Sequence, residues 1–208
     1  MPGDDFSDEL SEAISANVER KIRERVGGPR LPQGTVTVMF TDVEGSSELV
    51  RDLGDRRARH ILRRHDDIVR EAIRKHDGAE VERAGDSFMA AFSTARRAVA
   101  CALAIQQTLA LARQNHPDEA VQVRIGIDTG EVLSEQDRYF GSTVFRAARI
   151  ADLAPGGRIF VSEATKVLAS QVGFGFDDLG DHELKGLGAG HRLFEATTGP
   201  TEEAGDLG

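Results

Sequence analysis

AEVERAGDSFMAAF, residues 79–92, decides how the rest of the chain is organised. The segment is typical of two short strands that are joined by a tight turn at Ala84, Gly85 and Asp86. We therefore expect a β-hairpin here, and the neighbouring segments follow from it in both directions.

A helix and a strand are predicted on each side of this hairpin. Upstream, TVTVMFTD (35–42) alternates β-branched and apolar residues, as a central strand does, and a helical pattern extends over residues 55–75. Downstream, a helix is expected over 93–114, followed by the alternating strand VQVRIGID (121–128). We expect this strand to end in a turn at Thr129-Gly130.

The predicted order of these elements is β, α, β, β, α, β. This is the ferredoxin-like order, in which an antiparallel sheet carries helices on one face. The chain then predicts a C-terminal α/β extension: a helix over 143–153, a strand over 158–162, a helix over 163–170, and strands over 174–184 and 191–196. The expected fold class is therefore α+β.

The two ends of the chain differ from this core. Apolar residues recur every four positions from Phe6 to Val26, which predicts an N-terminal helix that lies on the main domain or on a second copy. GGPRLPQG (27–34) breaks that helix and is typical of a linker. We expect a helix and linker over 1–33, a globular domain over 34–197 and a disordered tail over 198–208.

Composition narrows the class of protein. With 39% apolar residues in 208, the chain suffices for one globular domain, and a net charge of −9 argues against a nucleic-acid partner. The single cysteine, Cys101, lies in an apolar run and is expected in the core. The chain shows no signal-peptide pattern and no apolar run near the ~18 residues of a membrane span. We expect a soluble, cytoplasmic protein.

Two aspartates occupy positions from which they can share a cation. Asp42 ends the first predicted strand and Asp86 lies in the hairpin turn, so a ferredoxin-like sheet can bring both to one edge. Mg²⁺ binds one or two protein carboxylates and completes its shell with phosphate oxygens and water. Gly45 and Ser46 begin a turn into a helix, where amide N–H groups can meet phosphates. By itself, the pattern is more often that of ordinary turn residues.

Three other patterns indicate structure rather than chemistry. KGLGAG (185–190) does not complete a phosphate-binding glycine loop, so we expect a flexible turn. The six histidines lack the spacing of zinc ligands. RRARHILRR (56–64) is expected to be a solvent-exposed helix face rather than a docking patch.

Five segments occur in an order and spacing that resemble those of class III adenylate and guanylate cyclases. They are FTDVEGSSEL (40–49), AGDSFMAAF (84–92), RIGIDTGEV (124–132), YFGSTVFRAARI (139–150) and ELKGL (183–187). The resemblance covers roughly residues 35–196 and implies a dimer with active sites at the subunit interface. One subunit would bring two metal-binding aspartates, and the other would bring groups that hold the ribose and the transferring phosphate.

The resemblance implies a role for five residues. Asp42 and Asp86 fall on the two metal-binding aspartates and the Val43 carbonyl on a backbone ligand, which implies two Mg²⁺ or Mn²⁺ ions. Arg149 falls on the arginine that stabilises charge at the α-phosphate, and Lys185 on the lysine that binds the terminal phosphates. A fixed cation at the α-phosphate stabilises the transition state more than the ground state.

Three residues depart from the family pattern. Phe145 stands where the family has an asparagine that orients the ribose, and phenylalanine cannot donate a hydrogen bond. Glu82 and Arg138 stand where adenylate cyclases read adenine with Lys and Asp, so both charges are reversed. Guanylate cyclases have Glu at the first of these positions but Cys at the second, so Arg138 matches neither group.

The pair of Glu82 and Arg138 leaves the base open. Glu offers only acceptors and Arg only donors, a combination that suits guanine or uracil, or adenine with the two roles exchanged. The related pyrimidine cyclases of bacterial antiphage defence are therefore included. Two alternatives are a Glu82–Arg138 salt bridge that touches no base, and a one-residue loop shift that presents Asp137 instead.

The resulting hypothesis is a homodimeric nucleotidyl cyclase that converts a nucleoside triphosphate to its 3′,5′-cyclic monophosphate and pyrophosphate. Family membership favours ATP, whereas Glu82 and Arg138 favour GTP or UTP. One alternative is a regulatory module that binds a nucleotide or only dimerises, and Phe145 favours it. Another is a heterodimer whose second chain supplies the missing asparagine.

Overall fold

A computed structural model describes residues 31–32, 34–135, 138–170 and 173–199 of the chain. The expected N-terminal helix and all but two residues of the tail predicted over 198–208 lie outside these ranges.

The central hairpin forms as predicted. β2 (Ala79–Ala84) and β3 (Ser87–Phe92) pair in antiparallel fashion, with Ala84 opposite Ser87. Gly85, the first of the two loop residues, has a φ of 61°, which glycine adopts without steric cost. β1 (Thr35–Val43) pairs with β3 through Thr41 and Phe88, so the hairpin turn lies beside the carboxyl end of β1.

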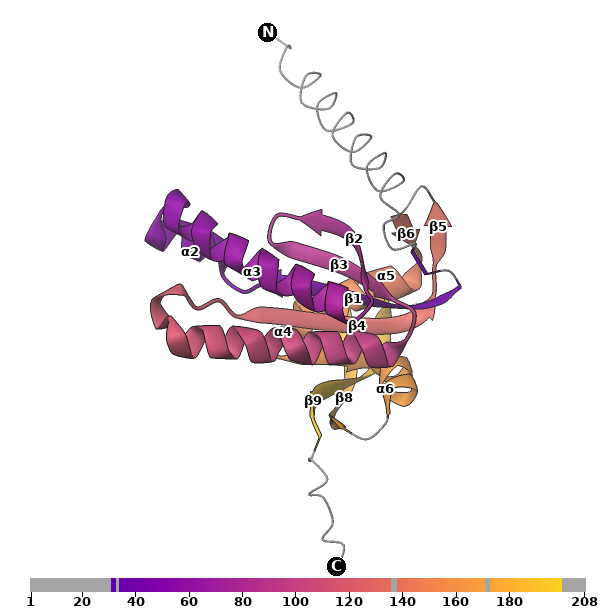
Figure 1. The fold of residues 1–208 in the computed structure, drawn as a ribbon. Coiled ribbons are helices and arrows are strands. Elements are labelled where there is room, and N and C mark those ends of the chain that lie inside the picture. Colours follow the sequence, from indigo (N-terminus) through magenta and orange to yellow (C-terminus); the bar gives the residue numbers. More distant parts are fainter. Residues whose placement is uncertain (1–30, 33, 136–137, 171–172, 200–208) are drawn as a thin grey trace, which may run out of the picture. The chain divides into compact units, whose positions relative to one another are not determined.

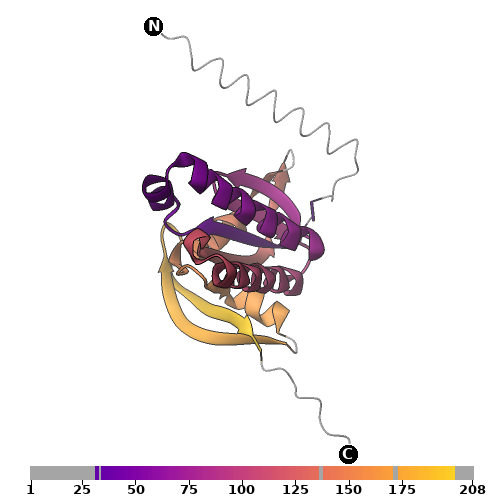
Figure 2. The same cartoon turned by 60° about the vertical axis from the view of Figure 1, so that its left-hand side comes forward.

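One seven-stranded sheet has the order β2-β3-β1-β4-β7-β9-β8 (Figure 1). Its first four strands, which end with β4 (Val123–Glu131), have the predicted ferredoxin-like arrangement. The predicted extension adds β7 (Ile159–Ser162), β8 (Phe174–Leu184) and β9 (Gly188–Thr198), whose β8–β9 hairpin is orange and yellow in Figure 2.

The sheet is antiparallel except at one pair. The core pairs among β1, β2, β3 and β4 are antiparallel, as predicted, whereas β4 and β7 of the extension run parallel, with Ile125 opposite Ile159. Parallel neighbours need a long crossover connection, and the segment between these strands contains α5 (Ser142–Leu153). The crossover helix is therefore what permits the parallel pair.

Helices cover both faces of the sheet. α3 (Asp55–Lys75) and α4 (Ala95–Asn115) lie side by side on one face, as predicted, and share its apolar core with α6 (Glu163–Ala169) (Figure 1). The hydroxyl of Thr94 caps α4 by accepting a hydrogen bond from the Arg97 amide. α5 packs on the opposite face. Two short elements, α2 (Ser46–Leu53) and the 3-10 helix η1 (Pro117–Glu119), complete the helices described.

Two segments differ from the prediction. Thr129 and Gly130 do not form a turn, because they pair with Thr37 and Val36 of β1 and so continue β4. β5 (Leu133–Glu135) and β6 (Arg138–Phe140) form a separate two-stranded sheet that was not predicted. Strands of three residues are too short to produce a recognisable alternation.

Other predictions for single features are confirmed. Cys101 is buried in the core, and burial raises the pKa of its thiol to about 12. Residues of the KGLGAG segment form the turn between β8 and β9, and the arginines at 56, 57, 59 and 63 are exposed on α3.

Among the helices described, none combines the length and the apolar character needed to cross a membrane.

Candidate active site

Asp42 lies near the end of β1 between partners from two neighbouring strands. Ser87 Oγ of β3 donates a hydrogen bond to Asp42 Oδ1 at 2.5 Å, and Arg124 Nε of β4 donates to Oδ2 at 2.8 Å. The side chains of Asp42 and Arg124 are 25% and 31% exposed. The carboxylate is therefore neutralised by an arginine while it stays accessible to a cation from solvent.

Asp86 is the second residue of the hairpin loop. Its Oδ2 atom is buried, and in the described part of the chain it has no hydrogen-bond partner. A buried carboxylate oxygen without a partner is costly, and a bound cation would remove that cost. Because Ser87, the next residue, is bonded to Asp42, the two predicted carboxylates lie at the same end of the sheet.

These residues fit a divalent cation that protein and phosphate share. The described residues contain no group of three or more His, Cys, Asp or Glu side chains that could hold a metal alone. Mg²⁺ is commonly bound by one or two carboxylates, with substrate phosphates and water as its other ligands. Val43, the predicted backbone ligand, follows Asp42 directly at the end of β1. The pair of aspartates therefore suits a metal whose remaining ligands are water or the phosphates of a nucleotide.

The turn after β1 is the segment predicted to meet phosphates. Gly45 has a φ of 70° and precedes α2, and no side chain in the described residues caps that helix. A hollow of about 390 Å³ adjoins the turn and is lined in part by Val43, Gly45 and Gln122. The amide groups of Ser46 and its neighbours, at a helix N-terminus, are suited to an anion there.

The predicted phosphate-binding cations lie in a second group. Arg149 of α5 is bonded to Asp152 at 2.9 Å and is 40% exposed, and Lys185 lies exposed in the turn after β8. Their chain neighbours Ile150 and Leu184 pack in one apolar cluster, which joins the two segments. Within the described ranges, no hydrogen bond or ion pair connects these cations to Asp42 or Asp86.

Close packing against β4 fixes the position of α5. A Cβ atom added at Gly126 would lie 2.1 Å from the backbone nitrogen of Ala151, so the helix backbone rests directly on the strand. Arg146 Nε of α5 also donates a hydrogen bond to Oδ2 of the buried Asp128 of β4 at 2.6 Å. These contacts fix the position of α5 on β4 and therefore the position of Arg149, which lies in α5.

The three residues that depart from the family pattern are all exposed. Phe145 of α5 is 61% exposed. Glu82 of β2 follows a register shift between Glu80 and Glu82, and Arg138 begins β6. Among the described residues no ion pair joins Glu82 to Arg138, so the structure does not show the alternative of a salt bridge between them. Asp137 lies outside the described residues.

Sequence reasoning missed Arg124, Ser87, Asp128 and Arg146. The first two contact Asp42, and the last two hold α5. Gly126 in β4 is a sequence signal of close packing. The contacts of Asp42 follow only from the register of β1 against β3 and β4, and the bond between Arg146 and Asp128 only from the packing of α5 on β4. Cross-strand register and the packing of α5 are therefore the information that was lacking.

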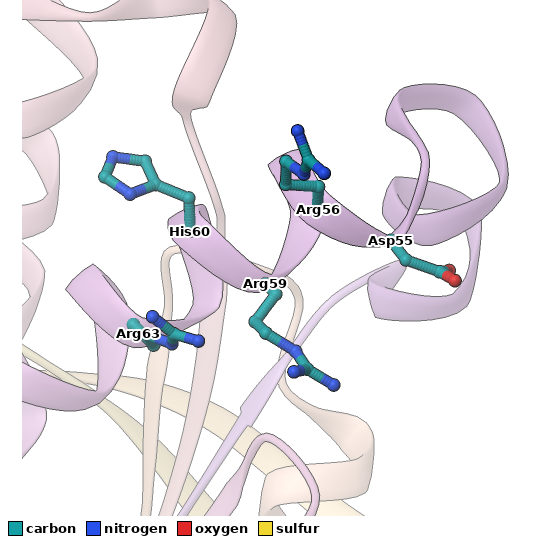
Figure 3. A pocket seen from close by; sticks show the side chains of 5 residues that line it. All are labelled: Asp55, Arg56, Arg59, His60 and Arg63. Carbon is teal, nitrogen blue, oxygen red and sulfur yellow. The ribbon is translucent and has the colours of Figure 1, made fainter.

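Two hollows of about 500 Å³ lie along α3, and neither is lined by a residue predicted for the active site. Figure 3 shows the first, which is lined by Asp55, Arg56, Arg59, His60 and Arg63. The arginines come from one exposed helix face, as the sequence predicts. The candidate active site therefore lies elsewhere, at the β1 and β2–β3 end of the sheet.

Comparison with known proteins identifies the family. The model of the adenylate and guanylate cyclase catalytic domain matches residues 30–195. An uncharacterized protein of Mycobacterium tuberculosis is 42% identical over 161 residues, which cover 75% of this chain and 53% of that protein. The chain thus spans about half the length of the curated relatives it matches.

Solved structures agree with this match. The adenylate/guanylate cyclase/hydrolase from Silicibacter pomeroyi is 30% identical, with a TM-score of 0.67 over 80% of this chain and 98% of that one. The adenylyl cyclase CyaB from P. aeruginosa, at 23% identity, shares the fold with a TM-score of 0.71 over 85% and 98% of the two chains. The chain belongs to the family of adenylate and guanylate cyclase catalytic domains.

Proposed function

We propose that the protein is a cytoplasmic, homodimeric, metal-dependent nucleotidyl cyclase that forms a 3′,5′-cyclic monophosphate and pyrophosphate from a nucleoside triphosphate. One observation carries the proposal. Asp86, whose buried Oδ2 has no hydrogen-bond partner in the part of the chain that the structure describes, lies at the same end of the sheet as Asp42. Two carboxylates with an unsatisfied oxygen favour a divalent cation, and the family supplies the class of reaction.

The metal half of the site would be formed by one chain. Asp42, Asp86 and the Val43 carbonyl would hold Mg²⁺ or Mn²⁺, two ions in the complete site, which supply Lewis acidity to activate the ribose 3′-oxygen. Arg124 already lies on Asp42 Oδ2 and is available for a phosphate oxygen once a cation takes its place on the carboxylate. The amides at Gly45 and Ser46 would bind the triphosphate.

The cationic half would come from a second copy. Arg149 would exchange Asp152 for the α-phosphate, where charge grows as the pyrophosphate leaves, and Lys185 would bind the terminal phosphates. Leu133 and Phe140, which face each other across β5 and β6, are exposed together with Phe145. Exposed apolar side chains of this kind are typical of a surface that a partner covers.

Phe145 favours a second candidate function. An exposed phenyl ring at the position that orients the ribose cannot hold the sugar by a hydrogen bond, and a misplaced 3′-oxygen can cost ~100-fold in rate. A regulatory module that binds nucleotide without turnover would tolerate this residue. So would a heterodimeric cyclase whose other chain supplies an asparagine.

A product assay tests the proposal. The purified chain is incubated separately with ATP, GTP, CTP and UTP in the presence of Mn²⁺, and mass spectrometry identifies the products. We expect one 3′,5′-cyclic nucleotide together with pyrophosphate. Absence of product from all four substrates would refute the homodimeric cyclase, and nucleotide binding without turnover would then support the regulatory module.

The residues that read the base can be tested by reversing their charges. The double variant Glu82→Lys with Arg138→Asp restores the pair that reads adenine in adenylate cyclases, so we expect kcat/KM for ATP relative to GTP and UTP to rise at least ~10-fold. Competition assays with paired nucleotides measure this ratio. Either single variant is the matched control, because it should lose activity without gaining ATP preference. An unchanged ranking would show that the pair does not contact the base.

A further inference from the structure

Arg83 and Phe88, one on each side of the Gly85–Asp86 loop, contact side chains of α3. Arg83, two positions before Gly85, donates a hydrogen bond from Nη2 to Asp66 Oδ2 at 2.5 Å. Phe88, two positions after Asp86, has its ring centroid 5.6 Å from the Arg83 guanidinium carbon. The loop that carries Asp86 is therefore held from both strands of the hairpin.

The anchor on α3 is buried. The side chain of Asp66 is 8% exposed, and its second oxygen lies 3.3 Å from Nδ1 of His65, which is fully buried and also packs against the Phe88 ring. A buried carboxylate is stable only with its partners in place, so Asp66 constrains Arg83 strongly. A charged pair of this kind favours one geometry of the strand end over others.

The same cluster reaches Asp86. Burial lowers the pKa of His65, and the charges of Asp66 and Asp86 act in the opposite direction, which places Asp86 within electrostatic range of the ring. Asp86 itself has the buried Oδ2 without a partner in the described residues. The neighbours of Asp86 are thus firmly held while its own oxygen stays free.

Mg²⁺ and Mn²⁺ sites tolerate little displacement of their ligands. Mg²⁺ needs near-ideal octahedral geometry at about 2.0–2.1 Å, and outer residues that hold a ligand typically affect metal affinity ~10–100-fold. A two-residue loop at a hairpin tip would otherwise move with the strand ends. The contact of Arg83 with Asp66 therefore affects the position of Asp86 relative to a bound cation.

We infer that Arg83, held by Asp66 and the ring of Phe88, is a positioning residue that fixes the β2–β3 loop so that Asp86 meets the cation shared with Asp42. This inference rests on the proposed function, because it assumes a metal at the two aspartates. In the proposed site, Arg83 contacts neither metal nor nucleotide. It acts through the backbone of the loop, and Asp66 is the group that holds it.

A second arginine provides the matched control. Arg70 of α3 donates to Glu80 of β2 from Nε at 3.0 Å and from Nη2 at 3.2 Å, and its guanidinium carbon lies 5.2 Å from the same Phe88 ring. It joins the same helix to the same strand, but Glu80 lies farther from the loop than Arg83 does. A variant without Arg70 should therefore lose a contact between α3 and β2 but keep the contact of Arg83 with Asp66, which lies next to the loop.

Metal affinity without nucleotide tests the inference. Electron paramagnetic resonance measures Mn²⁺ binding by the wild-type chain. The variant Asp86→Asn lacks the proposed ligand, so the binding that it loses is binding at Asp86. We expect Arg83→Gln to raise the Mn²⁺ Kd at least ~10-fold, Arg83→Lys to restore most of the affinity, and Arg70→Gln to stay within ~2-fold of wild type. Circular dichroism establishes that each variant is folded.

A double variant covers the case in which Arg83→Gln does not fold. Asp66→Asn with Arg83→Met removes both charges, leaves no buried charge unpaired and should fold, yet it lacks the hold on the loop. Wild-type Mn²⁺ affinity in folded Arg83→Gln or in the folded double variant would overturn the inference, as would a wild-type chain that binds no Mn²⁺ at Asp86. Mn²⁺ binding without a cyclic product would instead refute the proposed function and leave the inference standing.

Discussion

Asp42→Asn will lower cyclic nucleotide formation at least ~100-fold, because removal of a metal ligand should exceed the 10–100-fold cost typical of residues that only orient ligands. Asparagine is close to aspartate in shape; its remaining oxygen can accept the hydrogen bond from Arg124, and its amide group can donate to the Ser87 hydroxyl. The ion pair with Arg124 is partly exposed, so its loss should change the free energy of unfolding by no more than about 1 kcal/mol. Turnover should therefore collapse while the fold persists.

Steady-state kinetics with Mn²⁺ and the preferred nucleotide measure this effect. Asp67→Asn is the control, because Asp67 is an exposed carboxylate of α3 outside the candidate site. It should leave kcat and KM unchanged. Equal turnover by Asp42→Asn and the wild type would remove Asp42 from the metal site and with it the basis of the proposed function.

Gly126→Ala should have the largest effect on the fold. The added methyl group would lie 2.1 Å from the backbone nitrogen of Ala151 and 2.5 Å from the carbonyl oxygen of Ala147. Backbone atoms cannot rotate away, so α5 must shift, and we expect a loss of about 3 kcal/mol in the free energy of unfolding, at the upper end for overpacked cores. Because α5 carries Arg149, kcat should fall as well.

Urea denaturation followed by circular dichroism gives the size of the loss. Gly130→Ala is a matched control on the same strand, since the three atoms nearest its methyl group all belong to the Thr143 side chain, with Oγ1 at 2.6 Å. A side chain can adjust, so the loss there should be the smaller of the two. Equal stability of Gly126→Ala and the wild type would contradict the direct packing of α5 on β4.

Local sequence signals were enough to predict most of the fold. The hairpin at 79–92 and the helices over 55–75 and 95–115 depend on alternation, helical periodicity and capping within each segment. The errors involve pairing between distant segments. Thr129-Gly130 has the composition of a turn, but strand β1 pairs with both residues and keeps them extended. The parallel pairing of β4 with β7, for which no direction was predicted, likewise depends on the crossover between them.

The candidate site was predictable only in part, for the same reason. Asp42 and Asp86 were indicated by their places after a strand and in a turn, and the family motifs added Arg149 and Lys185. The structure places the two aspartates at one end of the sheet and packs the other two segments together. Arg124 was missed because its contact with Asp42 depends on which residues face each other across β1 and β4.

The central claim is that one chain holds two different halves of the site and that a second copy completes each half. The most direct test mixes Asp42→Asn with Arg149→Ala, each inactive alone, under conditions that allow subunits to exchange. Half of the dimers should then be mixed, and each mixed dimer has one intact site of two, so we predict about a quarter of wild-type activity. A mixture that forms mixed dimers but stays as inactive as its two components would contradict the shared site.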